Sequence, residues 1–162
     1  MAPEPASAGG TARLKGKATL IYILDTDVFS IVGFSDSPEY LRLHARVLEL
    51  SNEDRIATTI VTYEEQTRRW LAYTAKRRDT THQIGAYRRL KMHLKTYSNF
   101  DVLDFDNAAG LEFDRLKKLK IRVGTPDLKI AAIALSQSAL LITRNVKDFQ
   151  KIPELRVEDW TR

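Results

Sequence analysis

Short apolar runs alternate along the chain with longer segments in which apolar residues recur every three or four positions. The short runs predict β-strands at 21–24, 56–61, 101–105, 139–143 and 155–157. The longer segments predict helices over 37–50, 62–78, 81–97, after Asp106, and over 125–135, with Ser37 and Asp106 as expected N-caps. Strands that alternate with helices are typical of an α/β fold with a mainly parallel sheet.

The first predicted strand, Ile21-Tyr22-Ile23-Leu24, runs directly into Asp25 and Asp27. Ligands of open parallel sheets gather just outside the carboxyl ends of the strands, so Asp25 is a candidate site residue. The simpler alternative is that both acids only begin the next turn, as Asp often does.

Three further acids stand where a helix or a loop meets a predicted strand. Thr62 and Glu65 fit a capping box, so the simplest role of Glu65 is to cap the helix that Thr62 begins. Thr125 is the expected N-cap of a strongly apolar helix, and it places Asp127 at the mouth of that helix. Asp148 follows the strand at 139–143.

Right-handed crossovers bring the carboxyl ends of parallel strands to one edge of the sheet, so Asp25, Glu65 and Asp148 should meet there. Asp127 joins them if the loop before its helix lies on the same edge. Such a cluster repels itself unless some members are protonated or a divalent cation lies among them. Oxygen ligands favour a hard cation, Mg²⁺ or Mn²⁺.

Composition narrows the chemistry further. The chain has 162 residues, 43% of them hydrophobic, which is an ordinary composition for one folded domain. It has no cysteine, which excludes disulfides, zinc–thiolate sites and a thiol nucleophile and fits a reducing compartment. Its three histidines form no pair at metal-ligand spacing, which argues against a zinc hydrolase.

The formal charge is +5, and much of the positive charge lies in one stretch. Between 66 and 95 there are nine lysines and arginines and a single acid, Asp79. A solvated helix face explains such a run, but the interleaved Trp70, Tyr73, Tyr87 and His82 favour a surface that follows phosphates and stacks on bases. The candidate RNA-binding residues are Arg68, Arg69, Arg77, Arg78 and Arg88. The predicted buried stripe of the helix over 81–97 is Ile84, Tyr87, Leu90 and Leu94.

The ends of the chain set the domain organisation. Residues 1–19 are rich in Ala, Pro, Gly and Ser and predict a disordered leader, which leaves 20–162 as the folded domain. No segment approaches the length of a transmembrane helix.

Four motifs, in order, resemble those of PIN-domain nucleases. Leu24-Asp25-Thr26-Asp27 is similar to their opening Leu-Asp-Thr-Asn, and Thr62-Tyr63-Glu64-Glu65 is similar to the second motif. Asp127-Leu128-Lys129-Ile130-Ala131-Ala132 resembles the third. The segments 143–149 and 152–160 resemble the fourth motif and the C-terminus of VapC-type toxins. The chain departs from the pattern where Asp27 replaces the usual asparagine, adding a charge beside the site, and where Glu64 adjoins Glu65, so that either could be the ligand.

The resemblance implies a PIN-like three-layer α/β/α fold and a cytoplasmic Mg²⁺-dependent endoribonuclease, the toxin of a toxin–antitoxin pair. It implies that Asp25, Glu65, Asp127 and Asp148 coordinate the cation and act in catalysis. The supporting residues would be Thr26, Asp27, Thr143 and Asn145. A cognate antitoxin and a homodimer are implied as partners besides RNA.

Two other functions start from the same residues. A haloacid-dehalogenase-like phosphatase would use Asp25 as a nucleophile and needs a further acidic pair, for which Asp104 and Asp106 lack the Gly-Asp context. A non-catalytic RNA-binding or interaction module would use the four acids only as caps. A covalent aspartyl-phosphate would identify the first, and RNA binding that is insensitive to chelators would identify the second.

Overall fold

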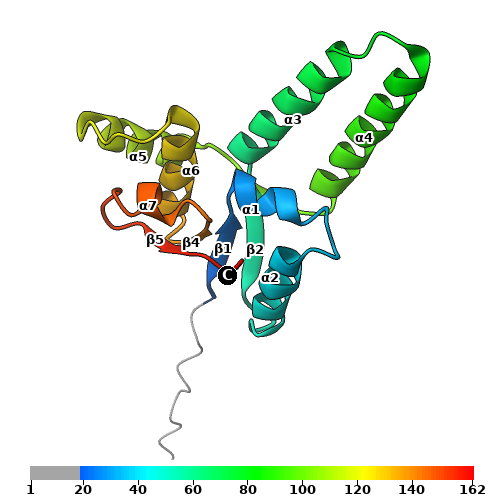
Figure 1. The fold of residues 1–162 in the computed structure, drawn as a ribbon. Helices are drawn as coiled ribbons and strands as arrows, with labels where there is room; N and C mark the ends of the chain where they lie inside the picture. The colour runs from blue at the N-terminus through cyan, green and yellow to red at the C-terminus, as the bar shows by residue number, and fades with distance from the viewer. Residues whose placement is uncertain (1–18) are drawn as a thin grey trace, which may run out of the picture.

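A five-stranded parallel sheet forms the centre of the protein (Figure 1). The computed structural model describes residues 19–162. Its strands are β1 (Ile21–Leu24), β2 (Arg55–Thr59), β3 (Asp101–Leu103), β4 (Leu140–Ile142) and β5 (Arg156–Glu158). They lie in the order β3-β2-β1-β4-β5, and every neighbouring pair is parallel, which confirms the predicted α/β class. Apart from residue 19, the leader predicted over 1–19 lies outside the described residues.

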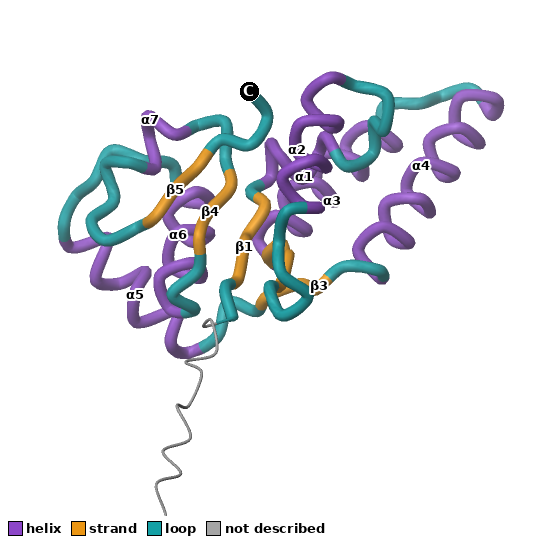
Figure 2. The backbone as a smooth tube through the Cα atoms, turned by 90° about the horizontal axis from the view of Figure 1, so that it is seen from below, coloured by secondary structure: helices purple, strands orange, loops and turns teal. Residues whose placement is uncertain are grey.

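Helices cover both faces of the sheet (Figure 2). They are α1 (Thr26–Ile31), α2 (Pro38–Leu48), α3 (Ile60–Ala75), α4 (Thr80–Ser98), α5 (Asn107–Lys118), α6 (Thr125–Ser136) and α7 (Val146–Phe149). Helices α5 and α6 lie on one side and α1 and α2 on the other, as a three-layer fold requires. Helices α3 and α4 form a hairpin that projects beyond the sheet (Figure 1). Within 19–162, no helix is long and apolar enough to cross a lipid bilayer.

Alternation along the inner strands divides the core into two clusters. Ile23 and Leu141 pack with the buried face of α6 and with Phe149 of α7. Tyr22, Leu24 and Ile142 point to the opposite face, toward α1, α2 and Trp160. Successive strand residues face opposite sides, so these short strands hold both helix layers and fix where their last residues emerge.

The second strand ends, and the following helix begins, earlier than the sequence predicts. Thr59, not Thr62, is the N-cap of α3, and the Thr62 backbone N–H donates to the Thr59 hydroxyl at 3.0 Å. The β-branched Ile60 and Val61 extend the strand pattern although they form the first turn of the helix. The predicted capping box is therefore wrong, and Glu65 lies well inside α3.

Two other helix starts differ from the prediction. Helix α1 follows β1 directly and is too short for a periodic pattern to reveal; Asp25 is its N-cap. The N-cap of α6 is Gly124, without a side-chain hydrogen bond, so the prediction of Thr125 as the cap is wrong by one residue. Ser37 and Asp106 are N-caps as predicted.

The buried stripe predicted for the second helix of the hairpin is also wrong. Ile84, Tyr87 and Leu94 are 56%, 61% and 58% exposed, and Leu90 is half-buried. The buried residues of α4 are Ala86, His93 and Tyr97. His93 and Tyr97 pack against Tyr63 of α3, so the aromatic contacts between the two helices decide which side of α4 is covered.

Candidate active site

Asp25 lies at the centre of the sheet edge where the strands end. Its backbone N–H donates to the Ile142 carbonyl at 3.1 Å, which ties the end of β1 to the end of β4. One carboxylate oxygen accepts from the Val28 backbone N–H at 2.8 Å, and the other accepts from the Thr143 hydroxyl. Asp25 is only 5% exposed. The carboxylate is thus held in one place by a helix start and by a neighbouring strand.

Burial changes the acidity of Asp25. Loss of water raises the pKa of this carboxyl to about 6, and the hydrogen bonds from Thr143 and Val28 only partly oppose that rise. The nearby charges of Asp27 and Asp127 raise the pKa further. The ionised form of Asp25 is therefore destabilised, and a cation bound next to it would stabilise that form.

Glu65 joins the site and Glu64 does not. The Glu65 carboxylate accepts a hydrogen bond from the hydroxyl of Thr26, the residue after Asp25. Glu64 is exposed and forms an ion pair with Arg68. Consecutive helical residues project about 100° apart, so only one of the two acids can face the strand ends, and in this structure it is Glu65.

Asp127 lies in the first turn of α6 and is half-buried. Burial raises the pKa of its carboxyl, and the charges of Glu65 and Asp148 raise it further. Among residues 19–162, no side chain forms a hydrogen bond or an ion pair with this carboxylate. Because Asp127 interacts through its charge with Asp25, Glu65 and Asp148, the loop before α6 lies on the same edge as the strand ends.

Asp148 lies at the rim of the site. It is partly exposed, forms an ion pair with Lys151, and accepts a hydrogen bond from the Asn145 side-chain amide at 3.1 Å. These contacts, Lys151 first, lower the pKa of Asp148. The Asn145 backbone N–H donates to the Thr143 hydroxyl at 3.0 Å, so Thr143 and Asn145 connect Asp148 with Asp25.

The extra charge that Asp27 was expected to add beside the site is neutralised. Both of its carboxylate oxygens accept hydrogen bonds from Arg144, in the segment after β4. Sequence reasoning assigned no role to Arg144, although it stands inside the fourth motif. Nothing in the linear sequence pairs residues 117 positions apart, and only the parallel pairing of β1 and β4 brings them together.

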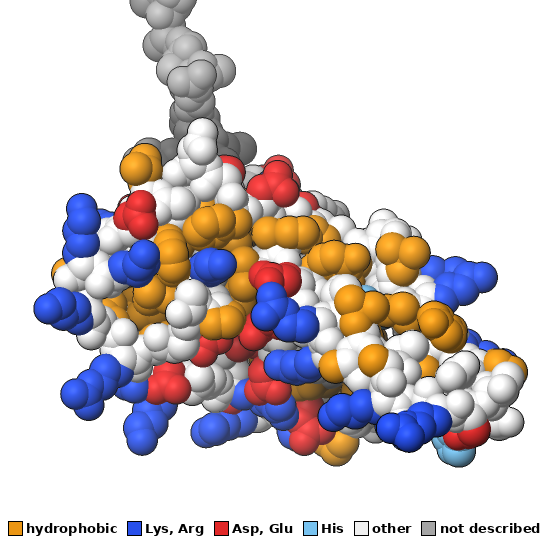
Figure 3. Space-filling view, turned by 90° about the horizontal axis from the view of Figure 1, so that it is seen from above, with side chains coloured by type: hydrophobic (Ala, Val, Ile, Leu, Met, Phe, Trp, Pro, Cys, Tyr) orange, Lys and Arg blue, Asp and Glu red, His pale blue; other side chains and the backbone are white. Residues whose placement is uncertain are grey.

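The donor chemistry of this edge fits a hard divalent cation. Its carboxylates come from the end of β1, from α3, from α6 and from α7, and Figure 3 shows acidic side chains gathered near the middle of this face with lysines and arginines around them. No lysine or arginine of the described residues forms an ion pair with Asp25, Glu65 or Asp127. In the described part of the chain, however, no three acidic or histidine side chains stand close enough to hold an ion as they lie. Any coordination by these acids would therefore require their side chains to move, and Asp148 would have to leave Lys151.

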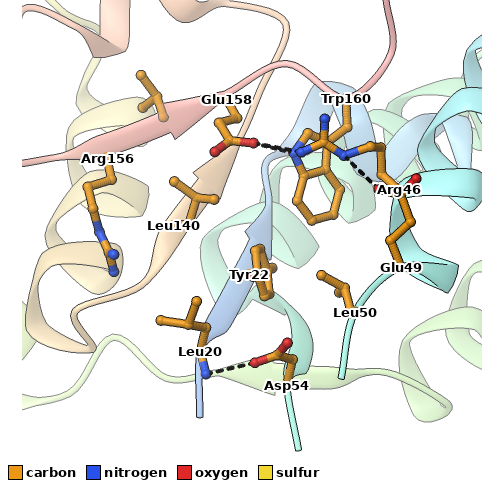
Figure 4. A pocket seen from close by; sticks show the side chains of 11 residues that line it. Leu20, Tyr22, Arg46, Glu49, Leu50, Asp54, Leu140, Arg156, Glu158 and Trp160 are labelled. Atoms are coloured by element: carbon orange, nitrogen blue, oxygen red, sulfur yellow. Dashed lines mark hydrogen bonds and ion pairs between the residues drawn. The ribbon is translucent and has the colours of Figure 1, made fainter. Parts of the chain in front are cut away.

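A cavity lies away from these acids. It has a volume of about 610 Å³ and opens between α2 and the β4–β5 side of the sheet (Figure 4). Arg46 forms an ion pair with Glu158 at 3.2 Å, and the Trp160 indole N–H donates to the same carboxylate at 2.7 Å. None of the four candidate ligands lines it; its own acids are Glu49, Asp54 and Glu158.

The basic hairpin presents most of its predicted RNA-binding residues to solvent. Arg68, Arg69, Arg78 and Arg88 are exposed. The Arg77 guanidinium instead lies over the Tyr73 ring, 4.1 Å from its centre. A groove of about 670 Å³ runs between α1 and the hairpin, with Arg69, Arg89, Trp70 and Tyr73 among its lining residues. Positive charge and aromatic rings are thus adjacent on this surface.

Sequence reasoning also missed Gln66, which joins the hairpin to the site. Its side-chain amide donates to the Thr26 carbonyl at 3.3 Å and to the Ser30 hydroxyl at 2.9 Å, and its oxygen accepts from the Tyr97 hydroxyl at 3.0 Å. The available signal was a polar residue on the inner face of α3. Because the predicted start of this helix was wrong, the residues that form that face could not be identified from the sequence.

Comparison with known proteins identifies relatives over nearly the whole described chain. The PIN domain family matches residues 22–155. Ribonuclease VapC1 of Haemophilus influenzae (strain R2866) is 33% identical over 145 residues, covering 88% of this chain and 100% of that protein. The tRNA(fMet)-specific endonuclease VapC of Salmonella typhimurium is 28% identical over 145 residues, covering 87% and 98%. The solved structure of VapBC-1 from nontypeable Haemophilus influenzae superposes with a TM-score of 0.67 at 28% identity, covering 88% and 100%.

The raised pKa of Asp25 makes a prediction about stability and pH. A carboxyl whose pKa rises on folding stabilises the protein below its unfolded value of 3.8, and this stabilisation is lost as the pH rises through about 6. In EDTA, Asp25→Asn should therefore match wild type near pH 4 and exceed it by about 2 kcal/mol near pH 7 in urea unfolding. Asp106→Asn, the same change at the exposed N-cap of α5, should show no such increase. A difference for Asp25→Asn that stays constant with pH would contradict this electrostatic description.

Proposed function

This chain belongs to the PIN domain family and, within it, to the VapC proteins, and we propose that it is an endoribonuclease that depends on a divalent cation. The observation that carries the proposal is the gathering of carboxylates at the strand ends. There Asp25 is buried and Asp127 is half-buried, each raises the other's cost of ionisation, and neither pairs with a lysine or arginine of the described residues. The names of the relatives, ribonuclease and endonuclease, support the same reaction class.

Four acids would hold the cation: Asp25, Glu65, Asp127 and Asp148. A bound Mg²⁺ or Mn²⁺ would supply a water of lowered pKa and would neutralise the charge that develops on the phosphate. Thr143 and Asn145 orient Asp25 and Asp148, and Thr26 orients Glu65, so each of these three acids has at least one oxygen already held by a hydrogen bond.

The protein side of this mechanism is mainly positioning. The hydrogen bonds from Thr143 and Val28 favour the ionised form of Asp25 and keep its carboxylate from turning away from the strand ends. Asp127 has no competing partner in the described residues, so its carboxylate is free to turn toward an ion. Asp148 would give up its Lys151 contact to hold the ion, and the lysine would then remain next to the site.

The PIN domain match replaces the phosphatase alternative. The non-catalytic alternative is decided by the cleavage experiment below.

We also propose that the protein is the cytoplasmic toxin of a toxin–antitoxin pair, with a cognate antitoxin and a second copy of itself as partners. The solved structure at 28% identity carries the name VapBC-1, and this name supports the proposed partnership for the present chain. Co-purification with the product of an adjacent reading frame, followed by measurement of mass in solution, tests both partners.

The proposed ligands predict a matched pair of variants on α3. Glu65→Gln should reduce RNA cleavage by more than about 100-fold, because loss of groups that merely support metal ligands already costs about 10- to 100-fold. Glu64→Gln changes the adjacent residue in the same way but faces Arg68, so its activity should stay close to wild type. The measurement is the rate of cleavage of a defined RNA in Mg²⁺, with EDTA as the second control.

Each outcome of that comparison has a meaning. Cleavage by wild type that persists in EDTA removes the divalent-cation proposal. Normal cleavage by Glu65→Gln together with an inactive Glu64→Gln would assign the ligand to the neighbouring residue. RNA binding without any cleavage would leave the interaction module as the function.

The exposed arginines of the hairpin generate a prediction about salt. Replacing Arg78 and Arg88 with alanine should weaken RNA binding and reduce the slope of log affinity against log salt by about 1.4, since each phosphate contact on a single strand contributes about 0.7. The double change Lys117→Ala/Lys118→Ala on α5 is the control, because these lysines lie on the other side of the sheet. An unchanged slope for the arginine variant would mean that these arginines only form a solvated surface and do not contact RNA.

A further inference from the structure

Arg144 lies at the rim of the acid site in a position that the fold fixes. The Thr143 backbone N–H donates to the Glu158 carbonyl at 2.9 Å, and the Thr143 hydroxyl binds Asp25. The next residue along the chain is Arg144, so its side chain starts beside the buried carboxylate. Its guanidinium reaches Asp27, on the first turn of α1, and Asp27 accepts a hydrogen bond from the arginine Nε at 2.6 Å and another from Nη2.

One carboxylate binds this guanidinium and two others act on it through their charge. Asp27 binds it directly, and Asp25 and Glu39 are close enough that their charges raise the pKa of Arg144 further. The Arg144 and Asp27 side chains are 42% and 47% exposed, so the pair is open to solvent. Arg144 is therefore a solvent-accessible cation next to the acid that lies at the centre of the proposed site.

We propose that Arg144 is a substrate-binding residue for the RNA backbone, and that Asp27 occupies its guanidinium until an RNA phosphate takes the place of the carboxylate. This inference rests on the proposed function, because it takes RNA as the ligand. It assigns roles to two residues: Arg144, which lies in the fourth motif, and Asp27, which stands where the resembled family usually has asparagine.

The geometry supports such an exchange. An arginine fork presents two parallel N–H groups to a carboxylate, and the same fork fits two oxygens of a phosphate. An exposed ion pair is weak, so the pair opens at little cost. A neutral asparagine in place of Asp27 would leave Arg144 permanently available, whereas the aspartate makes RNA compete with an internal anion. The pair therefore sets how readily a phosphate is held beside Asp25.

The test measures RNA binding without cleavage. Wild type and Asp27→Asn are titrated with a short single-stranded RNA in EDTA over a series of salt concentrations. We expect Asp27→Asn to bind about three- to fivefold more tightly at low salt, because RNA no longer displaces a carboxylate from Arg144. In Asp27→Asn/Arg144→Gln this gain should disappear, and the salt slope should fall by about 0.7 with the lost phosphate contact.

A matched pair elsewhere controls for the change in net charge. Asp101 forms an ion pair with Arg55, and the two side chains are 38% and 50% exposed, similar to Asp27 and Arg144. This pair lies where β2 and β3 begin, at the sheet edge opposite the acid site. Asp101→Asn releases an arginine with the same charge change, and we expect it to leave RNA affinity and salt slope unchanged.

The outcomes separate this inference from the proposed nuclease activity. Equal binding by wild type and Asp27→Asn, including a failure of both to bind, overturns the role of Arg144. A gain that persists in Asp27→Asn/Arg144→Gln, or that Asp101→Asn reproduces, reduces the effect to net charge and also overturns it. Because no step requires Mg²⁺ or cleavage, loss of the proposed catalytic function would be recognised separately, by wild type that binds RNA but does not cut it.

Discussion

Burial of the Asp25 carboxylate between the ends of two inner strands is the constraint on which the rest of the site depends. The same carboxylate begins α1, accepts from Thr143 after β4, and lies within the electrostatic reach of Asp27 and Asp127. Burial alone would favour the protonated acid, and only its two hydrogen bonds favour the charge. The fold therefore places a carboxylate where its ionisation is opposed, and this makes a cation at the strand ends energetically useful.

Within the described chain, the acids at the rim of the site have basic partners, and the acids further in do not. At the rim, Asp27 has Arg144 and Asp148 has Lys151. Further in, Glu65 accepts a hydrogen bond from the Thr26 hydroxyl, and no lysine or arginine in 19–162 pairs with Glu65 or Asp127. Basic side chains thus neutralise the acids that solvent already screens, and the less accessible acids retain their mutual repulsion. A divalent cation would fit this distribution better than another lysine, since it can accept several carboxylates at once.

Much of this arrangement follows from the sequence, because strand ends in a parallel sheet meet at one edge whatever the loop details. Asp25 and Asp148 could be placed from that rule, and Ser37 and Asp106 from helix capping. Where local patterns compete, the sequence misleads: Ile60 and Val61 look like strand residues but begin α3, and aromatic packing rather than apolar spacing turns α4. Pairs made by tertiary contact alone, such as Asp27 with Arg144 and Gln66 with Tyr97, leave no local signal.

The claim that these acids are gathered for a cation is tested most directly by a crystal structure of the protein grown with millimolar Mn²⁺, with anomalous diffraction locating the ion. We expect a peak within about 2.5 Å of carboxylate oxygens of Asp25 and Asp127, with Asp148 released from Lys151. An Asp127→Asn crystal under the same conditions should lose the peak. Well-ordered carboxylates with no anomalous peak between them, or a peak only at a lattice contact, would contradict the account.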